Sequence, residues 1–161
     1  MERGLHREGG WETSEVLDEA QLGFTVQEGE NDAMPTMPDM LIDAWEHRRG
    51  PAVFGTVNAE GQPNVIYVNC VWRLNEWQFV IADNYFHKTK ANIEAGSEGA
   101  LLFLSSTGGS YQVKGSIDYH TSGEVYETMK RWNDEMDPSR PGVGAAVVNV
   151  EEVYRGAERV L

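Results

Sequence analysis

The feature that most constrains the fold is a series of six short segments in which apolar residues alternate with polar ones or form brief β-branched runs. Such segments, separated by Gly, Asn and Pro, are typical of β-strands. Residues 111–119 show the alternation clearly, with Tyr111, Val113, Ile117 and Tyr119 on one face. The other predicted strands are residues 53–57, 65–73, 77–82, 100–104 and 145–150. These patterns predict a mainly β protein.

Three further segments have helical features. They cover residues 39–47, 87–95 and 124–136, and Gly96 follows the second as a typical helix-ending residue. A turn at Gly61 and a second turn before residue 77 favour antiparallel neighbours. Mostly antiparallel strands with a few short helices suggest a small closed barrel, and periodicity alone does not tell which barrel.

Residues 1–38 differ from the rest of the chain in charge. Nine acidic residues there face only Arg3 and Arg7. We therefore divide the chain into an acidic N-terminal extension, residues 1–38, and one domain, residues 39–161. The acidic composition of the extension predicts a mobile arm. Its apolar residues, among them Trp11 and Phe24, leave open the alternative that it docks on its own barrel or on a partner subunit.

The formal net charge of −13 excludes whole classes of partner. Nucleic acids and anionic membrane surfaces both attract basic faces, so neither is an expected partner. No run approaches the roughly 18 apolar residues of a membrane span. The first ten residues do not resemble a signal peptide, and Cys70 is the single cysteine. We expect a cytoplasmic protein.

The sequence offers no clear metal or nucleophile site. The four histidines, at positions 6, 47, 87 and 120, form no pair with zinc-ligand spacing, so we expect no structural metal. Cys70 lies on the apolar face of residues 65–73, where a buried and inert thiol is the better interpretation.

The segment with the clearest chemistry is Asn84 to Asn92, which follows a predicted strand and opens a predicted helix. Free N–H groups attract anions at such a place, although first turns usually carry acids. Here Lys88 and Lys90 stand in an acidic chain. A bound phosphate would explain them, with Lys88 supplying charge and Thr89 a hydroxyl. Taken alone, the segment also fits a solvated helix end.

Four blocks of sequence, in order, carry a family resemblance. They are residues 53–57 with the turn 60–63 and the strand 64–72; residues 81–84 leading into 87–93; residues 111–117; and residues 145–154. The chain from about Met40 to Tyr154 resembles the FMN-binding split barrels of the pyridoxamine 5′-phosphate oxidase-like superfamily. The resemblance implies a mainly β split barrel, six-stranded, antiparallel and Greek-key-like, with short flanking helices.

The resemblance also implies a site for FMN. The flavin phosphate would be bound by Lys88 and Thr89, with His87 and Asn92 close by. The ribityl chain and ring edge would lie along the strand after the first turn, and the end of the third strand would border the ring. The residues implied there are Ile66, Tyr67, Val68, Asn69, Ala82 and Asp83. Backbone groups would make many of these contacts.

Proteins of this kind are usually homodimers with flavins at the subunit interface, so the resemblance implies a homodimer. The partner would contribute from its late helix or last strand. Trp132 is a candidate for stacking on the ring, but its helical spacing favours a core position. Gln112 and Lys114 are candidates for further phosphate contacts, although a solvated strand face explains them better.

The implied function is an FMN-binding flavoprotein, a small oxidoreductase or electron-transfer protein acting on a small-molecule or electron-transfer partner. The arginine-rich features that bind the substrate phosphate in the oxidase are not found near the C-terminus, so pyridoxamine phosphate is not the expected substrate. Two alternatives remain. One is a non-enzymatic protein that binds or senses a flavin, a deazaflavin or haem; the other is an interaction domain with an empty groove. The phosphate motif favours FMN over haem.

Overall fold

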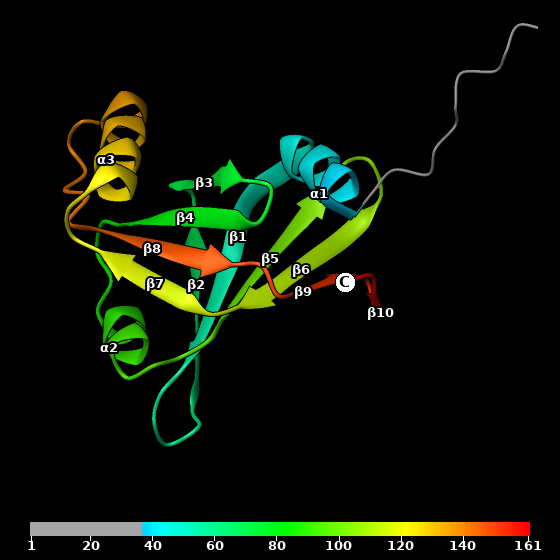
Figure 1. Cartoon of the computed structure of the whole chain (residues 1–161), viewed down its shortest axis with the longest axis horizontal. Coiled ribbons are helices and arrows are strands. Elements are labelled where there is room, and N and C mark those ends of the chain that lie inside the picture. Colours follow the sequence, from blue (N-terminus) through cyan, green and yellow to red (C-terminus); the bar gives the residue numbers. More distant parts are fainter. Residues whose placement is uncertain (1–36) are drawn as a thin grey trace, which may run out of the picture. The chain divides into compact units, whose positions relative to one another are not determined.

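The computed structural model describes residues 37–161, which form three helices and ten strands (Figure 1). The predicted acidic extension, residues 1–38, lies outside the described residues except for its last two. The elements are α1 (Met37–Glu46), β1 (Arg48–Val57), β2 (Pro63–Val68), β3 (Val71–Asn75), β4 (Gln78–Asp83), α2 (Lys88–Glu94), β5 (Gly99–Ser105), β6 (Gly109–Gly115), β7 (Ile117–His120), α3 (Glu124–Met136), β8 (Gly144–Asn149), β9 (Glu152–Arg155) and β10 (Glu158–Arg159).

The strands form two antiparallel sheets. The larger has the order β10-β9-β6-β5-β1-β2, and the smaller has the order β3-β4-β8-β7. The predicted class, a mainly β split barrel with short helices, is confirmed. The closed barrel that the strand pattern alone suggested is not formed, because the chain builds two separate sheets (Figure 1).

Two predicted strands are divided in the structure, which is one reason for ten strands in place of six. Residues 65–73 break at Asn69 and Cys70, where the amide of Val71 donates to the carbonyl of Asn69 at 3.0 Å. β2 before the break belongs to the larger sheet, and β3 after it belongs to the smaller one. The short strands β9 and β10 also follow β8 near the C-terminus.

The break also changes which side chains are buried. The predicted alternation of apolar even positions would leave Val71 on a partly polar face, but Val71 is buried together with Cys70. Val71 packs in the core between the two sheets, whereas Cys70 packs in a second core on the other face of the smaller sheet. The crossing between sheets therefore places two consecutive side chains in two different cores.

The first core fills the space between the sheets and α1. Its centre is aromatic, because Trp45 meets Phe79 and Phe103 edge-on at ring-centroid distances of 4.7 and 5.0 Å. Such edge contacts add to the stabilisation from burial. β4 is buried on both faces, with Phe79 and Ile81 in this core and Val80 and Ala82 in the second one.

The second core lies between the smaller sheet and α3. Met129 of α3 is fully buried there, and Trp132 packs against Trp72 at a centroid distance of 5.8 Å. The core interpretation of Trp132 is therefore confirmed. No helix within residues 37–161 has both the length and the apolar character needed to cross a membrane.

The predicted strand 111–119 is divided at Ser116, and Gly115 is the last residue before the crossing. A Cβ atom built at Gly115 would lie only 1.6 Å from the carbonyl oxygen of Asn149. The backbones of Gly115 and Asn149 are both held by hydrogen bonds to neighbouring residues of the sheets, so neither can move cheaply. Only glycine fits at this passage between the sheets.

We expect Gly115→Ala to lower the free energy of unfolding by about 3 kcal/mol, the upper part of the usual range for overpacked sites. The control is Gly55→Ala, because the nearest atom to a Cβ at Gly55 is an ordinary 3.7 Å away. Its effect should stay below about 1 kcal/mol. Urea unfolding measures both variants, and equal losses would contradict the crowding at Gly115.

Candidate functional site

The turn between β4 and α2 is built on Asp83. Its side chain is 1% exposed and accepts hydrogen bonds from the Phe86 amide at 2.8 Å and from the Tyr119 hydroxyl at 2.6 Å. Burial and the bond to Asp83 together raise the pKa of Tyr119. Asp83 therefore lies beneath the turn and fixes its shape, and Ala82 packs in the second core.

Four polar side chains join α2 to β1 and β2, and we call Thr56, Asn64, Thr89 and Asn92 the polar quartet. The Asn92 amide donates to the Thr56 hydroxyl at 3.0 Å, and the Asn64 amide donates to the Thr89 hydroxyl at 3.0 Å. A longer bond of 3.4 Å links Asn64 to Thr56. Thr56, Thr89 and Asn92 are buried. Thr89 thus holds Asn64 in place beneath the first turn of α2.

A cavity of about 510 Å³ opens beside the polar quartet, and we call it the Lys88 cavity. Its lining consists of Asn58, Gln62, Pro63, Asn64, Lys88, Ala91 and Asn92. Lys88 is the single charged residue in this lining. α2 has only seven residues, so the charge of Lys88 is the main attraction for an anion in this cavity.

The two lysines at the start of α2 differ in their surroundings. Lys90 pairs with Glu94 at 3.9 Å and lies over the ring of Tyr119 at 5.5 Å. Lys88 is exposed and has no acidic partner within residues 37–161. Its charge is therefore free to meet an anion from solution, whereas the charge of Lys90 is partly compensated.

A second cavity, of about 380 Å³, lies at the far end of β2, and we call it the Arg140 cavity. It is lined by Ile66, Tyr67, Val68, Asn69, Cys70, Asn84, Tyr85, Phe86 and Arg140. All four residues predicted on β2 and just after it are in this lining. Apolar and aromatic walls with a few polar groups are typical of sites for small organic ligands.

The two cavities have no lining residue in common, but both draw on β2 and on the chain that follows β4. β2 supplies Asn64 to the first and Ile66 to Val68 to the second, and the chain from Asn84 to Asn92 supplies the opposite wall of both. A strand rises about 3.3 Å per residue, so Asn64 and Val68 lie roughly 13 Å apart. The arrangement suits an elongated ligand with an anionic end at Lys88 and a flat apolar end near Arg140.

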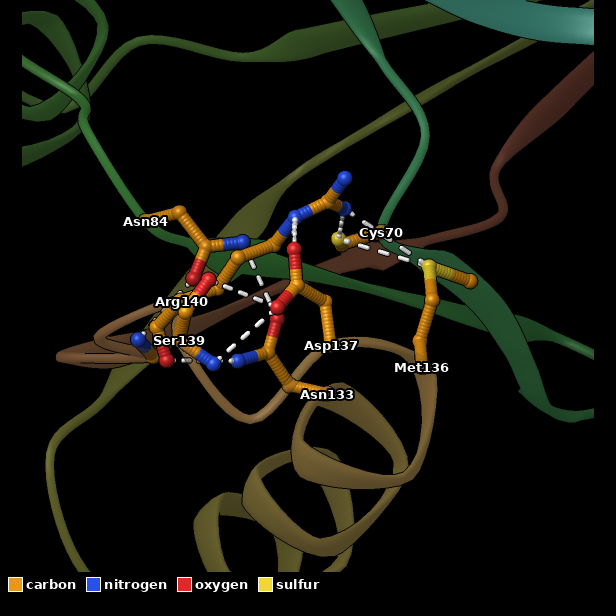
Figure 2. A network of polar contacts seen from close by, with 8 residues as sticks. Cys70, Asn84, Asn133, Met136, Asp137, Ser139 and Arg140 are labelled. Carbon is orange, nitrogen blue, oxygen red and sulfur yellow. Dashed lines mark hydrogen bonds and ion pairs between the residues drawn. The ribbon is translucent and has the colours of Figure 1, made fainter.

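Arg140 is held by a network of polar contacts (Figure 2). Its Nη1 donates to Cys70 Sγ at 2.6 Å, and its Nε lies 3.2 Å from Asp137 Oδ2. The bond to Cys70 is the main cause of a raised pKa of Arg140, and Asp137 adds to it. Hydrogen bonds from Ser139 lower the pKa of Asp137, so the carboxylate beside Arg140 is ionised.

The loop that carries Arg140 is tied to the end of β4. Asn133, fully buried on α3, donates to the Arg140 carbonyl at 3.2 Å and accepts from the Asn84 amide at 3.0 Å (Figure 2). The Gly142 amide donates to the Asn84 side chain at 2.9 Å. Asn84 therefore fixes both α3 and the loop that follows it.

The structure adds residues that the sequence did not point to. Arg140 lies in a loop without periodicity, and Thr56 has the pattern of an ordinary strand residue. Neither could therefore be identified as a site residue from the sequence. Cys70 is buried as predicted, but it is also one of the residues that line the Arg140 cavity.

Other candidates lie apart from the two cavities. His87 is exposed at the start of α2, makes no capping hydrogen bond and lines neither cavity. Lys114 lies 4.8 Å from the Tyr154 ring centre and lines a third cavity with Glu98 and Pro63. Within residues 37–161, His, Cys, Asp and Glu side chains form no cluster of three that could hold a metal ion.

One curated relative is similar over much of the chain. It is the uncharacterized protein MJ0282 of Methanocaldococcus jannaschii, 29% identical over 101 residues, which are 62% of this chain and 68% of the relative. Among solved structures, HupZ of Group A Streptococcus superposes with a TM-score of 0.59 and 24% identity, covering 65% of this chain and 83% of HupZ.

Two further solved structures are described with their ligands. One is an FMN-binding protein of Syntrophomonas wolfei, with a TM-score of 0.55, 15% identity and coverage of 68% of this chain and 76% of that chain. The other is HutZ, the haem storage protein of Vibrio cholerae, with a TM-score of 0.53, 13% identity and coverage of 76% and 95%. At these identities the likeness is one of fold.

The family model for pyridoxamine 5′-phosphate oxidase matches residues 41–155. This match spans β1 to β9, which are all the strands of both sheets except β10, and it includes the residues that line both cavities. The chain therefore belongs to the pyridoxamine 5′-phosphate oxidase family.

Proposed function

We propose that the protein binds FMN, with the phosphate in the Lys88 cavity and the ring in the Arg140 cavity, and that it works as a small oxidoreductase or electron-transfer protein. The observation that carries this proposal is the uncompensated Lys88. It lies beside Asn64 and Asn92 at one end of a tract that leads along β2 to an apolar, aromatic cavity.

The Lys88 cavity has the donors that a phosphate needs. An ammonium group gives a charge-assisted hydrogen bond, the strongest kind available to a phosphate in proteins. The Asn64 amide already donates to Thr89 and Thr56, and the Asn92 amide donates once, to Thr56, so one N–H group of Asn92 remains beside the ammonium group. In this arrangement Lys88 binds the phosphate, and Thr89 positions Asn64.

The Arg140 cavity suits a flat ring with a polar edge. Ile66, Val68 and Phe86 supply apolar surface, and the exposed ring of Tyr85 borders the opening. β2 is an edge strand of the larger sheet, so one row of its backbone N–H and C=O groups has no strand partner. These groups can bond the nitrogen and oxygen atoms of a flavin whatever the side chains are.

FMN supplies the redox chemistry when bound, and the protein supplies binding, orientation and electrostatics. The residues named above hold the cofactor and shield one side of its ring. None of them is proposed as a catalytic acid or base. The single cysteine fits a reducing compartment and supports a place in the cytoplasm.

Haem is the second candidate, since HutZ shares the fold and stores haem. The linings of the Lys88 and Arg140 cavities contain no histidine, and His87 is exposed outside them. Cys70, Tyr67 and Tyr85 are the side chains in the Arg140 cavity of a kind that binds haem iron, and the Cys70 sulfur already accepts a hydrogen bond from Arg140. The side chains that line the two cavities therefore favour FMN over haem. A deazaflavin that carries a phosphate would be favoured for the same reason.

We also propose a homodimer whose interface is the outer face of the larger sheet. Val53 lies opposite Tyr67 on β2 and opposite Leu102 on β5, so apolar side chains form a row across three strands. The exposed members of this outer face are Val57, Val65, Tyr67, Leu102 and Leu104. Exposed apolar patches of this kind mark interfaces.

A second copy of the chain is the occupant that best fits this outer face. Tyr67 is 78% exposed on β2 and also lines the Arg140 cavity. A subunit seated on the face would therefore close the open side of the cavity and shield the flavin from water. This shielding is the functional reason for the dimer.

The first test is cofactor uptake by the purified full-length protein. We expect flavin absorption bands at roughly 370 and 450 nm, either as isolated or after addition of FMN. Lys88→Ala should weaken FMN binding by about 1.5–3 kcal/mol, the value of a hydrogen bond to a charged group. Riboflavin lacks the phosphate, so its affinity should be the same for the variant and the wild type.

Lys130→Ala serves as a matched control, because Lys130 pairs with Asp134 on α3 and lines neither cavity. Its FMN affinity should be unchanged. A protein that takes up no FMN would refute the proposed function. Equal losses of FMN and riboflavin affinity in Lys88→Ala would refute the phosphate role of Lys88.

The dimer has its own test. We expect the wild type to sediment as a dimer and Val65→Glu to sediment as a monomer, because burying an unpaired carboxylate in an interface is costly. Thr121→Glu places the same charge on the exposed turn after β7 and should stay dimeric. A wild type that remains monomeric at every concentration measured would overturn this proposal.

A further inference from the structure

Arg140 is the single cation in the lining of the Arg140 cavity, where it faces apolar and aromatic walls. A guanidinium usually extends into solvent, but this side chain is only 32% exposed. Its Nε is paired with Asp137 and its Nη1 with Cys70. The guanidinium is thus held at the cavity wall, with part of its charge compensated by Asp137.

Part of the guanidinium remains available. Arginine carries five N–H donors, and the contacts with Asp137, Cys70 and Met136 involve only Nε and Nη1. Nη2 makes none of the contacts that hold the Arg140 side chain among residues 37–161. In Figure 2 one terminal nitrogen of Arg140 points away from the labelled partners. Its donors can therefore meet a ligand in the cavity.

The position of Arg140 is set before a ligand binds. Pro138 and Pro141 flank the loop and restrict its backbone. The Arg140 carbonyl is held by Asn133, and the loop is tied to β4 through Asn84 (Figure 2). Because Arg140 is already held in place, its guanidinium does not have to be reoriented when a bound ligand becomes charged. This is the basis of electrostatic preorganisation.

We propose that Arg140 raises the reduction potential of FMN bound in this cavity by stabilising the negative charge of the reduced ring. The inference rests on the proposed function. FMN gains one negative charge on the ring when an external reductant delivers two electrons and one proton is taken up. A fixed cation at the ring lowers the energy of that charged state more than the energy of the neutral oxidised ring. Cys70 and Asp137 serve as supports that position the guanidinium.

The experiment uses the FMN-loaded full-length protein and measures the midpoint potential of the flavin against reference dyes under anaerobic conditions. Arg140→Gln removes the charge, and we expect its preference for reduced over oxidised FMN to fall about tenfold. For a two-electron couple this corresponds to a potential about 30 mV lower. Arg140→Met keeps much of the side-chain stem and should show the same shift, which guards against misfolding of either variant.

A second readout is independent of the dyes. The spectrum of the reduced flavin changes when its ring is protonated, and a nearby cation lowers the pKa of that step. We expect this pKa to rise in both neutral variants. Arg131→Gln is the control, because Arg131 is exposed on α3, carries the same charge and lines no part of the cavity. Its potential and pKa should match those of the wild type.

The outcomes separate the two proposals. An unchanged potential and pKa in Arg140→Gln and Arg140→Met, with FMN still bound, would overturn the role of Arg140 and leave FMN binding intact. Equal losses of affinity for oxidised and reduced FMN would also overturn it, because they would mean simple positioning. A wild type that binds no FMN would overturn both proposals together.

Discussion

Hydrogen bonds among Thr56, Asn64, Thr89 and Asn92 tie α2 to β1 and β2, and the arrangement of both cavities depends on them. Buried amides and hydroxyls cost about 1–3 kcal/mol each when a partner is lost, so the quartet is stable only as a complete set. Because it is complete, the first turn of α2 cannot drift along the sheet. Lys88 therefore projects at a fixed place beside the edge strand, and the tract along β2 has a defined charged end.

The electrostatics of the molecule contrast with those of its cavities. The chain has a net charge of −13 and repels anions at long range, yet each of the two main cavities has one cation in its wall. Lys88 has no acidic partner within residues 37–161, while Arg140 is oriented by a carboxylate and a thiol. An anionic ligand is therefore attracted to the two cavities by direct contact with Lys88 or Arg140, and not by the electrostatic field of the whole protein.

Local patterns predicted most of the elements; the failures are the two strands that divide where the chain passes between the sheets, and the short strands β9 and β10, which were not predicted. Residues 124–136 were predicted as a helix and form α3 with the same bounds, because a regular apolar stripe signals packing on one face. Residues 65–73 were predicted as one strand, since alternation cannot show that Asn69 and Cys70 carry the chain from one sheet to the other. Arg140 was not identified, because a loop arginine becomes part of a site only through the distant residues that folding brings next to it.

The break between β2 and β3 places the Arg140 cavity at the boundary of the two sheets, with β2 on one side and the chain after β4 on the other. A ligand there contacts both halves of the barrel, so it binds only while the halves are together. By mass action its binding free energy adds to the free energy of unfolding, by about 2.7 kcal/mol at a hundredfold excess over Kd. A rise in the melting temperature of this protein therefore reports that a molecule has bound in the cavity, including a molecule that does not absorb visible light.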